Sequence, residues 1–409
     1  MSVTETRPLR HNRDFRLLWA GAGISALGGT ITSVTYPLLM IWYGGSPVQA
    51  GLVGFAALLP MLLLQLPAGV FVDRWDRRRV MIVCDAVSFV SIGSVAISLL
   101  FGTLWLPHLL VVAFLEGSAQ IFYRLSERAA VRNVVRPEHL PAALSQNEAR
   151  SRAAGLLGQP LGSALFALVR WAPFVFTAIG HLIALVTLLL IRKEFQTTRE
   201  SGRRDVRAEI AEGVGWLLRQ RFLRSAVLLV GCTNILFQIL SLSLAVTIKN
   251  HGGSPAVIGV IGAASGVGGV LGAMSGSWFV RRLRPGVVII VVFAVWAAFM
   301  PLIALTANPV LLGAVFAGMS FAGALINVMA GVYQVQVTPD EMQGRVGSVA
   351  GLLSSGANSF GALTAGFLLA SLSVGSTVLG VSAVMALLAV TAWLTPVIRT
   401  TQYREGVST

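Results

Sequence analysis

Two acidic residues lie inside long apolar segments of this chain, Glu116 within 107–126 and Asp85 within 80–102. A carboxylate in the middle of a bilayer is costly unless it is protonated, paired with a cation or in contact with water. Because burial favours the neutral carboxyl group, such a residue can take up and release protons near neutral pH. Glu116 falls near mid-bilayer, which makes it a candidate for proton coupling or cation binding. A protonated Glu116 that only supports helix packing is the alternative.

The other polar residues of the apolar segments are candidates for an ion pair, for helix packing or for a substrate cavity. Asp85 is close enough in sequence to Arg77 and Arg79 for a structural ion pair, and we assign His181 to helix packing. The amide side chains expected at a substrate cavity are Asn234, Gln238, Asn327 and Asn358. The first two are four residues apart and share one helix face. For each of the four, an interhelical hydrogen bond without a substrate is the alternative.

The sequence shows no pattern for metal, nucleotide or covalent chemistry. Cys84 and Cys232 are far apart and form no metal-ligand spacing. No Gly-x-x-x-x-Gly-Lys-Ser/Thr loop is present to hold ATP phosphates. Paired acids, histidine clusters or a nucleophile–base pair near one membrane face, which an enzyme would need, are not apparent. We therefore expect no cofactor, no metal and no enzymatic activity, with an ion gradient as the driving force.

Twelve apolar segments must position these residues. Hydrophobic residues make up 55% of the 409 positions and charged residues only 12%, whereas ordinary globular domains carry about 25% charged residues. A membrane-spanning helix needs about 20 mostly apolar residues. Such runs occur at 16–43, 48–72, 80–102, 107–126, 143–167, 171–191, 222–248, 255–280, 286–306, 308–332, 346–371 and 376–397. The expected fold class is an all-α membrane protein with twelve transmembrane helices.

An internal repeat divides the segments into two halves. Gly44-Gly-Ser-Pro before the second segment matches Gly252-Gly-Ser-Pro before the eighth, and Val135-Arg-Pro matches Val337-Thr-Pro before the fifth and eleventh. Parallel repeats of this kind place a substrate site near the bilayer midplane, where the halves face each other. The expected domains are an N-terminal tail 1–15, six-helix bundles 16–191 and 222–397, a cytoplasmic linker 192–221 and a C-terminal tail 398–409.

Basic residues set the orientation of the segments. With the N-terminus in the cytoplasm, that side receives all of the 31 Lys and Arg residues except Arg170 and Lys249, in agreement with the positive-inside rule. The formal net charge of +14 therefore lies in short loops and not on a soluble face that could bind nucleic acid. Both termini are expected in the cytoplasm. One chain holds both halves, so we expect no obligate protein partner besides the surrounding lipid bilayer.

The linker 192–221 contains a regular apolar pattern. Val206, Ile210, Val214 and Leu217 recur at three- and four-residue spacing with charges between them. This pattern predicts an amphipathic helix on the inner membrane surface. A solvated, partly disordered linker is the alternative.

The loop between the second and third segments carries a known signature. It reads Gly69-Val-Phe-Val-Asp73-Arg74-Trp-Asp76-Arg77-Arg78. This resembles the loop Gly-x-x-x-Asp-Arg/Lys-x-Gly-Arg-Arg/Lys of the major facilitator superfamily, with Asp76 in place of the inner glycine. The resemblance covers essentially the whole chain and implies two pseudo-symmetric six-helix bundles. It also implies that this loop latches the cytoplasmic gate, with Glu127 as its expected partner; a role in orientation alone is the alternative.

Further motifs resemble those of exporters. The segment 143–167 contains Gly155-Leu-Leu-Gly158-Gln-Pro160-Leu-Gly162, which is similar to the Gly- and Pro-rich motif of the superfamily's exporters. The stretches from His11 and Thr338 look most like the enterobactin-exporter and macrolide-efflux branch, whose members mostly export siderophores or antibiotics. We therefore expect a transporter in a bacterial inner membrane that exports a small organic molecule in exchange for protons. A proton-coupled importer of a nutrient is the first alternative, and a membrane-embedded sensor or enzyme is the second.

Overall fold

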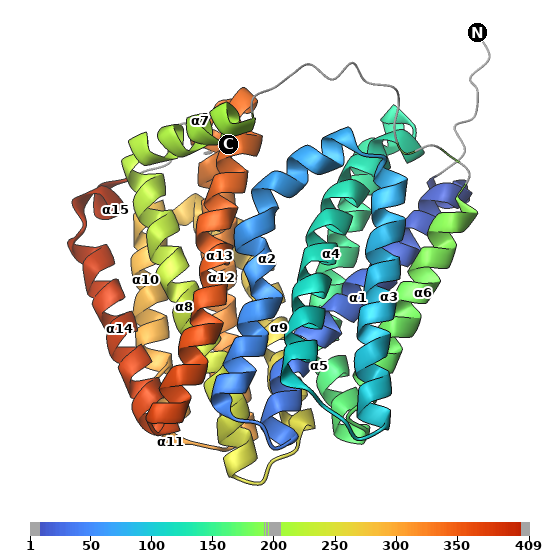
Figure 1. The fold of residues 1–409 in the computed structure, drawn as a ribbon. Helices are drawn as coiled ribbons and strands as arrows, with labels where there is room; N and C mark the ends of the chain where they lie inside the picture. Colours follow the sequence, from blue (N-terminus) through green and yellow to red (C-terminus); the bar gives the residue numbers. More distant parts are fainter. Residues whose placement is uncertain (1–8, 192, 194, 196–205, 402–409) are drawn as a thin grey trace. The chain divides into compact units, whose positions relative to one another are not determined.

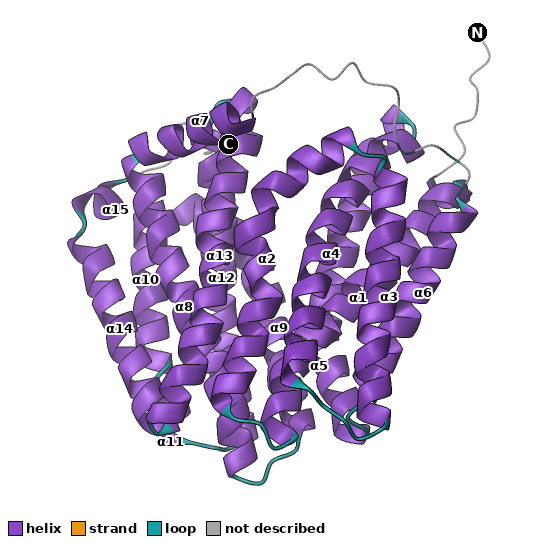
Figure 2. Ribbon diagram, viewed as in Figure 1, coloured by secondary structure: helices purple, strands orange, loops and turns teal. Residues whose placement is uncertain are grey.

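Helices make up nearly all of the described chain (Figure 2). The computed structural model describes residues 9–191, 193, 195 and 206–401, and these ranges contain no strand. Twelve long helices correspond to the twelve apolar segments, the ninth being divided into α10 and α11 (Figure 1). Their bounds are α1 Arg13–Trp42, α2 Pro47–Arg74, α3 Arg77–Leu100, α4 Leu106–Val134, α5 Leu140–Leu168, α6 Ala172–Leu190, α8 Arg221–Asn250, α9 Pro255–Arg282, α10 Pro285–Phe299 with α11 Leu302–Leu305, α12 Pro309–Val337, α13 Gln343–Ser371 and α14 Val374–Leu394. The expected all-α membrane fold is confirmed.

Short helices occupy the segments between the long ones. The structure shows α7 Val206–Arg219, α15 Pro396–Thr400 and one-turn 3-10 helices at Leu9–His11, Pro137–His139 and Asp340–Met342. Parts of the expected tails 1–15 and 398–409 and of the linker 192–221 lie outside the described residues, namely 1–8, 192, 194, 196–205 and 402–409.

Most of the long helices can cross a bilayer. Within the described residues, 11 helical segments are long and apolar enough to do so. The exception is α5, whose first half carries Glu148, Arg150 and Arg152. The chain is thus a multi-pass membrane protein.

Equivalent turns precede α2 and α9, as the internal repeat predicts. Gly44 has φ +90° and Gly252 has φ +72°, a left-handed conformation that glycine adopts without a steric penalty. Ser254 caps α9 by accepting a hydrogen bond from the backbone N–H of Ala256. The two Gly-Gly-Ser-Pro stretches therefore serve the same turn, since proline is favoured in the first turn of a helix.

The signature loop contains the N-cap at which α3 begins. Asp76, which stands in place of the inner glycine, accepts hydrogen bonds from the backbone N–H groups of Arg78 and Arg79 at 2.9 and 3.1 Å. These bonds make Asp76 the N-cap of α3, because a side-chain oxygen at this position satisfies free N–H groups of the first turn. The substitution thus keeps a defined turn between α2 and α3.

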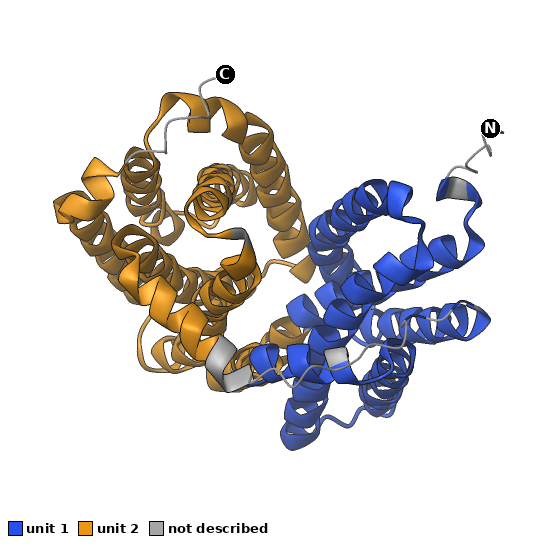
Figure 3. Cartoon of the chain, turned by 90° about the horizontal axis from the view of Figure 1, so that it is seen from above, with its two compact units in different colours: residues 1–35, 63–204 blue, residues 36–62, 205–409 orange. Residues whose placement is uncertain are grey.

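The described residues divide into two compact units, shown in two colours in Figure 3. Unit 1 contains residues 1–35 and 63–204, and unit 2 contains residues 36–62 and 205–409. The segment Tyr36–Leu62, from the end of α1 and the start of α2, therefore groups with the C-terminal helices. A division of the chain into bundles 16–191 and 222–397 stays a prediction.

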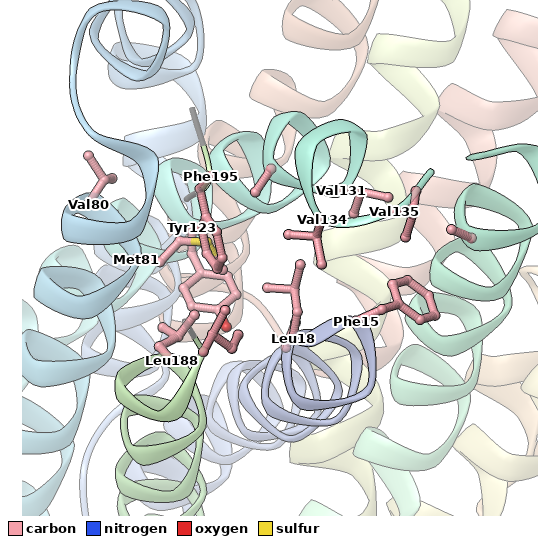
Figure 4. Packing of buried hydrophobic residues seen from close by; sticks show 14 of the residues in the cluster. Phe15, Leu18, Val80, Met81, Tyr123, Val131, Val134, Val135, Leu188 and Phe195 are labelled. Atoms are coloured by element: carbon pink, nitrogen blue, oxygen red, sulfur yellow. The ribbon is translucent and has the colours of Figure 1, made fainter. Parts of the chain in front are cut away.

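One end of unit 1 is closed by an apolar core (Figure 4). Phe15 and Leu18 of α1, Met81 of α3, Tyr123 of α4 and Leu188 of α6 belong to one buried cluster. Four helices far apart in sequence thus meet at the end of the unit that is expected to face the cytoplasm. This core fixes the rotation of α4, on which the candidate site depends.

Glycines bring α9 and α12 of unit 2 into close contact. A methyl group added at Gly268 would lie 2.1 Å from the carbonyl oxygen of Ala317, and one at Gly272 would lie 2.3 Å from that of Phe321. Such small residues allow backbones to approach closely in a membrane. At Gly269, next to Gly268, the same methyl group would meet no atom within 4 Å.

The linker helix α7 packs against unit 2. Leu217 lies in a buried cluster with Leu223 of α8 and with Val346 and Val349 of α13. Glu212 accepts a 2.6 Å hydrogen bond from the guanidinium of Arg345 on α13. A helix thus forms where the apolar spacing predicts one, although the side chain of Val206 is outside the description. Val214 and Leu217 pack in this cluster, and a position of α7 on the inner membrane surface stays a prediction.

Candidate functional site: a buried acid–histidine–acid cluster

Glu116 of α4 is one of three buried ionisable side chains in unit 1. It is only 2% exposed. Its Oε1 atom lies 3.3 Å from Nε2 of His181 on α6 and accepts a 3.2 Å hydrogen bond from Nε2 of Gln120, one turn along α4. A carboxylate placed this way has an imidazole and a neutral amide donor beside it, and polar partners of this kind lower the cost of an acid inside a membrane.

Asp85 of α3 contacts the other ring nitrogen of the same imidazole. Its Oδ1 atom lies 2.9 Å from Nδ1 of His181 and accepts a 3.1 Å hydrogen bond from Oγ of Ser25 on α1. The expected ion pair between Asp85 and the arginines Arg77 and Arg79 is wrong, because the Asp85 side chain points into the bundle toward α6. His181, which the sequence assigns to helix packing, lies between two acids, and a role for it in proton exchange stays a prediction.

Close packing of α1 makes room for this cluster. A methyl group at Gly29 would lie 2.2 Å from the amide nitrogen of Gln120, and one at Gly28 would lie 2.8 Å from Cγ2 of Thr177 on α6. The absence of side chains at these two positions lets α1 approach α4 and α6. The Gln120 amide can therefore extend over Gly29 and reach Glu116.

The cluster can change its charge by taking up protons. With both carboxyl groups ionised and a neutral imidazole the net charge is −2, and two added protons bring it to zero. A doubly protonated imidazolium carries one N–H on the side of each carboxylate. Within the described residues, Asp85 Oδ2, Glu116 Oε2 and His181 Nε2 are buried and have no hydrogen-bond partner, so the 3.3 Å contact between His181 and Glu116 is an ion-pair distance and not a hydrogen bond. These interacting sites titrate as one unit and not as three separate residues.

The cluster is not arranged as a metal site. Both imidazole nitrogens face carboxylate oxygens, so neither is directed with the acids toward a common point. No group of three His, Cys, Asp or Glu side chains in the described part of the chain could hold a metal ion. The arrangement is suited to holding and passing protons.

Glu127 lies eleven residues after Glu116 on α4 and has a different partner from the one expected. Its carboxylate forms a buried ion pair with Arg150 of α5 at 2.9 Å and accepts a 3.0 Å hydrogen bond from Asn147. Arg150 also donates to the carbonyl oxygen of Trp19 on α1 at 3.3 Å. Glu127 therefore links α4 to α5 inside unit 1, and a contact with the gating loop stays a prediction.

The arginines of the signature loop donate hydrogen bonds to backbone carbonyl groups of unit 1. Arg77 donates a 3.5 Å hydrogen bond to the carbonyl of Ala129, and Arg78 donates at 3.2 and 3.1 Å to those of Leu188 and Leu189. The latter two belong to the last turn of α6, where carbonyl groups lack helical partners and attract cations. Arg74 is exposed, no atom lies near the Cβ position of Gly69, and the side chain of Asp73 is not described.

The exporter-type glycines pack α5 against α1. A methyl group at Gly158 would lie 2.5 Å from Cβ of Thr30, and one at Gly162 would lie 3.2 Å from Cα of Ile31. Pro160 lies inside the helix between them, and Gly155 has open space. Since Thr30 follows Gly29 directly, this contact supports the part of α1 that borders the cluster.

The four amide residues of the expected substrate cavity all lie in unit 2. Asn234 of α8 donates a 2.9 Å hydrogen bond to the carbonyl oxygen of Ser354, one turn before Asn358 on α13. Gln238 is half-buried where α8 crosses Gly361 of α13. The helix pair α8–α13 thus carries three of the four, whereas Asn327 is exposed on α12. Their role in substrate binding stays a prediction.

A profile of the protein family described as "Transmembrane secretion effector", a family of the major facilitator superfamily, matches residues 3–406. The chain belongs to this family. Its members are transporters, so the chain is a transporter of the superfamily and not an enzyme.

Relatives with assigned functions are drug exporters. The chain is 26% identical over 399 residues to the multidrug efflux pump Tap of Mycolicibacterium fortuitum, an alignment that covers 94% of this chain and 95% of that protein. It is 29% identical over 220 residues to Tap of Mycobacterium tuberculosis, covering 49% and 50% of the two chains. Macrolide efflux protein A of Streptococcus pyogenes is 23% identical over 221 residues, covering 53% and 54%.

Solved structures of other superfamily members share the fold. A bacterial homologue of the human lysosomal transporter Spinster matches 98% of this chain and 100% of its own, with a TM-score of 0.75 and 14% identity. The nucleoside transporter NupG matches 93% of this chain and 99% of its own, with a TM-score of 0.73 and 12% identity. At these identities the likeness shows the fold alone.

Sequence reasoning identified one acid of the cluster and missed its partners. His181 is the only ionisable residue in the segment 171–191, and Gln120 follows Glu116 by one helical turn. Both features of the sequence indicate a polar contact shared between helices. The contact between His181 and Asp85 cannot be predicted from the sequence, because it depends on how α3 and α6 are rotated toward each other.

Proposed function

We propose that this member of the transmembrane secretion effector family is a secondary active exporter that moves a small organic molecule out of a bacterial cell in exchange for protons. The observation that carries the proposal is the His181 bridge between Glu116 and Asp85. Export is supported by relatives that are named as efflux proteins. Their alignments cover nearly the whole of this chain in one case and about half of it in another. Proton coupling is supported by the cluster.

Protonation of the cluster would change the contacts between helices. When Glu116 is ionised, its Oε1 atom contacts His181 on α6 and accepts a hydrogen bond from Gln120 on α4. A proton on Glu116 weakens its attraction for the imidazolium, and a second proton on Asp85 weakens the link to α3 and to Ser25 of α1. Loading of protons from outside would thus loosen a junction of four helices, and release inside would restore it. Differential protonation of two conformations is what an ion-driven transporter needs.

The charge of the candidate sites supports a proposal for the substrate class. The amide residues of α8 and α13 are neutral, and the buried acids Glu116, Asp85 and Glu127 all lie in unit 1. A neutral or singly cationic lipophilic compound, such as an antibiotic or a metabolite, suits this distribution. We place the protein in the cytoplasmic membrane with both termini inside, as its basic loops indicate.

Export is tested in cells. Small molecules inside and outside the native strain are compared with and without the gene, and uptake of erythromycin and ethidium is measured in a host that lacks its own efflux pumps. An exporter lowers internal drug levels, and its loss makes a compound accumulate inside and disappear from the medium. A nutrient left unused by the deletion strain would overturn export in favour of import.

Coupling is tested in liposomes. Glu116→Gln should abolish ethidium accumulation driven by an acidic lumen, because the amide cannot carry the proton. Ser118→Ala is the matched control on the opposite face of α4, where the hydroxyl bonds only to the carbonyl of Phe114 in its own helix. Intact pH-driven transport by a normally inserted Glu116→Gln protein would rule out the coupling role.

A further inference from the structure

We propose that Tyr123 and Glu127 form a proton path along α4 between the buried cluster and the cytoplasmic side of the protein. This inference rests on the proposed proton coupling and extends it from the loading site to a route. Four observations carry it: the spacing on α4, the burial, the unpaired polar atoms and the charges around Tyr123.

The first observation is the alignment of three polar residues on one helix face. Tyr123 follows Glu116 by seven residues and Glu127 follows Tyr123 by four, and these intervals keep side chains on the same side of an α-helix. The rise of about 1.5 Å per residue separates Glu116 from Glu127 by roughly 16 Å along the axis. The face thus runs from mid-bilayer toward the end of α4.

The second observation is that this face is inside the protein. Glu116 is 2%, and Tyr123 and Glu127 are each 7% exposed. The Tyr123 ring packs in the apolar cluster near Met81, Leu188 and Phe195 (Figure 4). A polar stripe that is buried over this length is costly unless its groups have hydrogen-bonding partners.

The third observation is that several of these groups have none. Among the described residues, the Tyr123 hydroxyl, Glu116 Oε2 and Nε of Arg150 are buried without a hydrogen-bond partner. Such groups in membrane-protein interiors are normally bridged by ordered water. Water between Glu116, the Tyr123 hydroxyl and Glu127 would satisfy them together and connect them for proton transfer.

The fourth observation is the charge around the middle of the path. The charges of Asp85 from the cluster and of Glu127 with Arg150 from the far end all act on the Tyr123 hydroxyl. The other ionisable group that acts on it is the Cys84 thiol of α3. Tyr123 is therefore within electrostatic reach of both ends of the path.

Proton transfer along this route conserves charge at each step. The Glu116 carboxyl group gives its proton to bridging water, the Tyr123 hydroxyl accepts a proton from that water while donating its own onward, and Tyr123 is neutral before and after. The proton reaches the Glu127 carboxylate and neutralises it. Its hold on Arg150 weakens, and release through half-buried Asn147, beside exposed residues of α5, restores the ion pair.

The experiment separates proton movement from substrate movement. The full-length protein is reconstituted in liposomes with ethidium as the probe, and two rates are measured: accumulation driven by an acidic lumen, and ethidium exchange at equal pH, which needs no net proton transfer. Tyr123→Phe removes only the hydroxyl, whereas Glu127→Gln removes the titratable group and also the charge that pairs with Arg150. Tyr123→Phe should slow pH-driven accumulation at least tenfold and leave exchange within twofold of the unmodified protein. Glu127→Gln should slow pH-driven accumulation at least tenfold more than it slows exchange, and Ser118→Ala should leave both rates unchanged.

The outcomes distinguish this path from the coupling on which it rests. Loss of pH-driven transport in Glu116→Gln with unchanged transport in Tyr123→Phe and Glu127→Gln would overturn the path and keep the coupling site. Equal loss of both rates in Tyr123→Phe would also overturn it, since that result marks a structural role. If the unmodified protein exchanges ethidium but shows no pH-driven transport, the proposed proton coupling fails and the path with it.

Discussion

At the scale of single residues, His181 is the centre of the site because its imidazole lies between two acids. Its imidazole is 2% exposed, and its two nitrogens lie 2.9 and 3.3 Å from carboxylate oxygens. Removing one partner of a buried ion pair typically costs about 3–5 kcal/mol, since the remaining charge is left without compensation.

We expect His181→Gln to lower the melting temperature of the purified protein and to abolish pH-driven transport. The difference in melting temperature from the unmodified protein should shrink as the pH falls, because protonated Glu116 and Asp85 no longer need a cation. His108→Gln is the control: His108 on the same unit bonds only to Ser94 at 2.8 Å, so about 1 kcal/mol is at stake. A pH-independent difference for His181→Gln would contradict the role assigned to the acids.

The residue scale also shows where sequence reasoning ends. Glu116 was recognisable because an acid within twenty apolar residues has few harmless explanations. Asp85 was misassigned because its distance in sequence from Arg77 suggested a partner, whereas the rotation of α3 turns it toward α6 and away from that arginine. Helix rotation is set by packing of many apolar side chains, and spacing along one segment does not reveal which faces of two helices meet.

At the scale of elements, length and apolarity were sufficient to place the twelve long helices. The end of α4 was the main exception: the segment expected to end at 126 continues to Val134. Its last residues include Glu127, Arg128 and Arg132, which an apolar count excludes. They remain helical because Glu127 is paired with Arg150, while the two arginines are exposed.

Two adjacent glycines of α9 give a direct test of helix packing. Gly268→Ala should destabilise the protein by about 3 kcal/mol or more, because its methyl group would lie 2.1 Å from the Ala317 carbonyl oxygen and the backbone of α12 would have to move. Gly269→Ala should be neutral or stabilise by up to about 1 kcal/mol, since it gains helix propensity in open space. Thermal unfolding followed by tryptophan fluorescence compares the two; equal melting temperatures would refute the close contact.

A similar pair tests the exporter-type motif on α5. Gly158→Ala places a methyl group 2.5 Å from Cβ of Thr30 and should push α1 away from α5, at a cost of about 1–3 kcal/mol. Gly155→Ala meets nothing within 4 Å and should retain full transport. Ethidium transport and melting temperature are the readouts. Unaltered values for both variants would mean that the motif does not fix the position of α1.

At the scale of the whole molecule, the orientation in the membrane is a prediction from the basic residues of the loops. Because nearly all basic residues fall on one side, a fluorescent protein fused after Thr409 should fluoresce in cells, and alkaline phosphatase fused there should be inactive. The complementary probe is His251→Cys, at an exposed position near Lys249, in a protein that also carries Cys84→Ser and Cys232→Ser. It should react with a membrane-impermeant maleimide added outside the cell; protection there together with an active phosphatase would reverse the topology.

The membership of Tyr36–Leu62 in unit 2 has a consequence for biosynthesis. Glycines let this segment pack tightly on α13: a methyl group at Gly51 would lie 2.7 Å from the carbonyl oxygen of Ala362, and one at Gly366 would lie 2.8 Å from that of Pro47. A ribosome adding about 5–20 residues per second makes the segment on the order of ten seconds before the helices it will contact. During that interval its small-residue face is without its final neighbours, so lipid or the insertion machinery must cover it. The nascent chain is therefore most exposed to misassembly and proteolysis between synthesis of α2 and synthesis of α13.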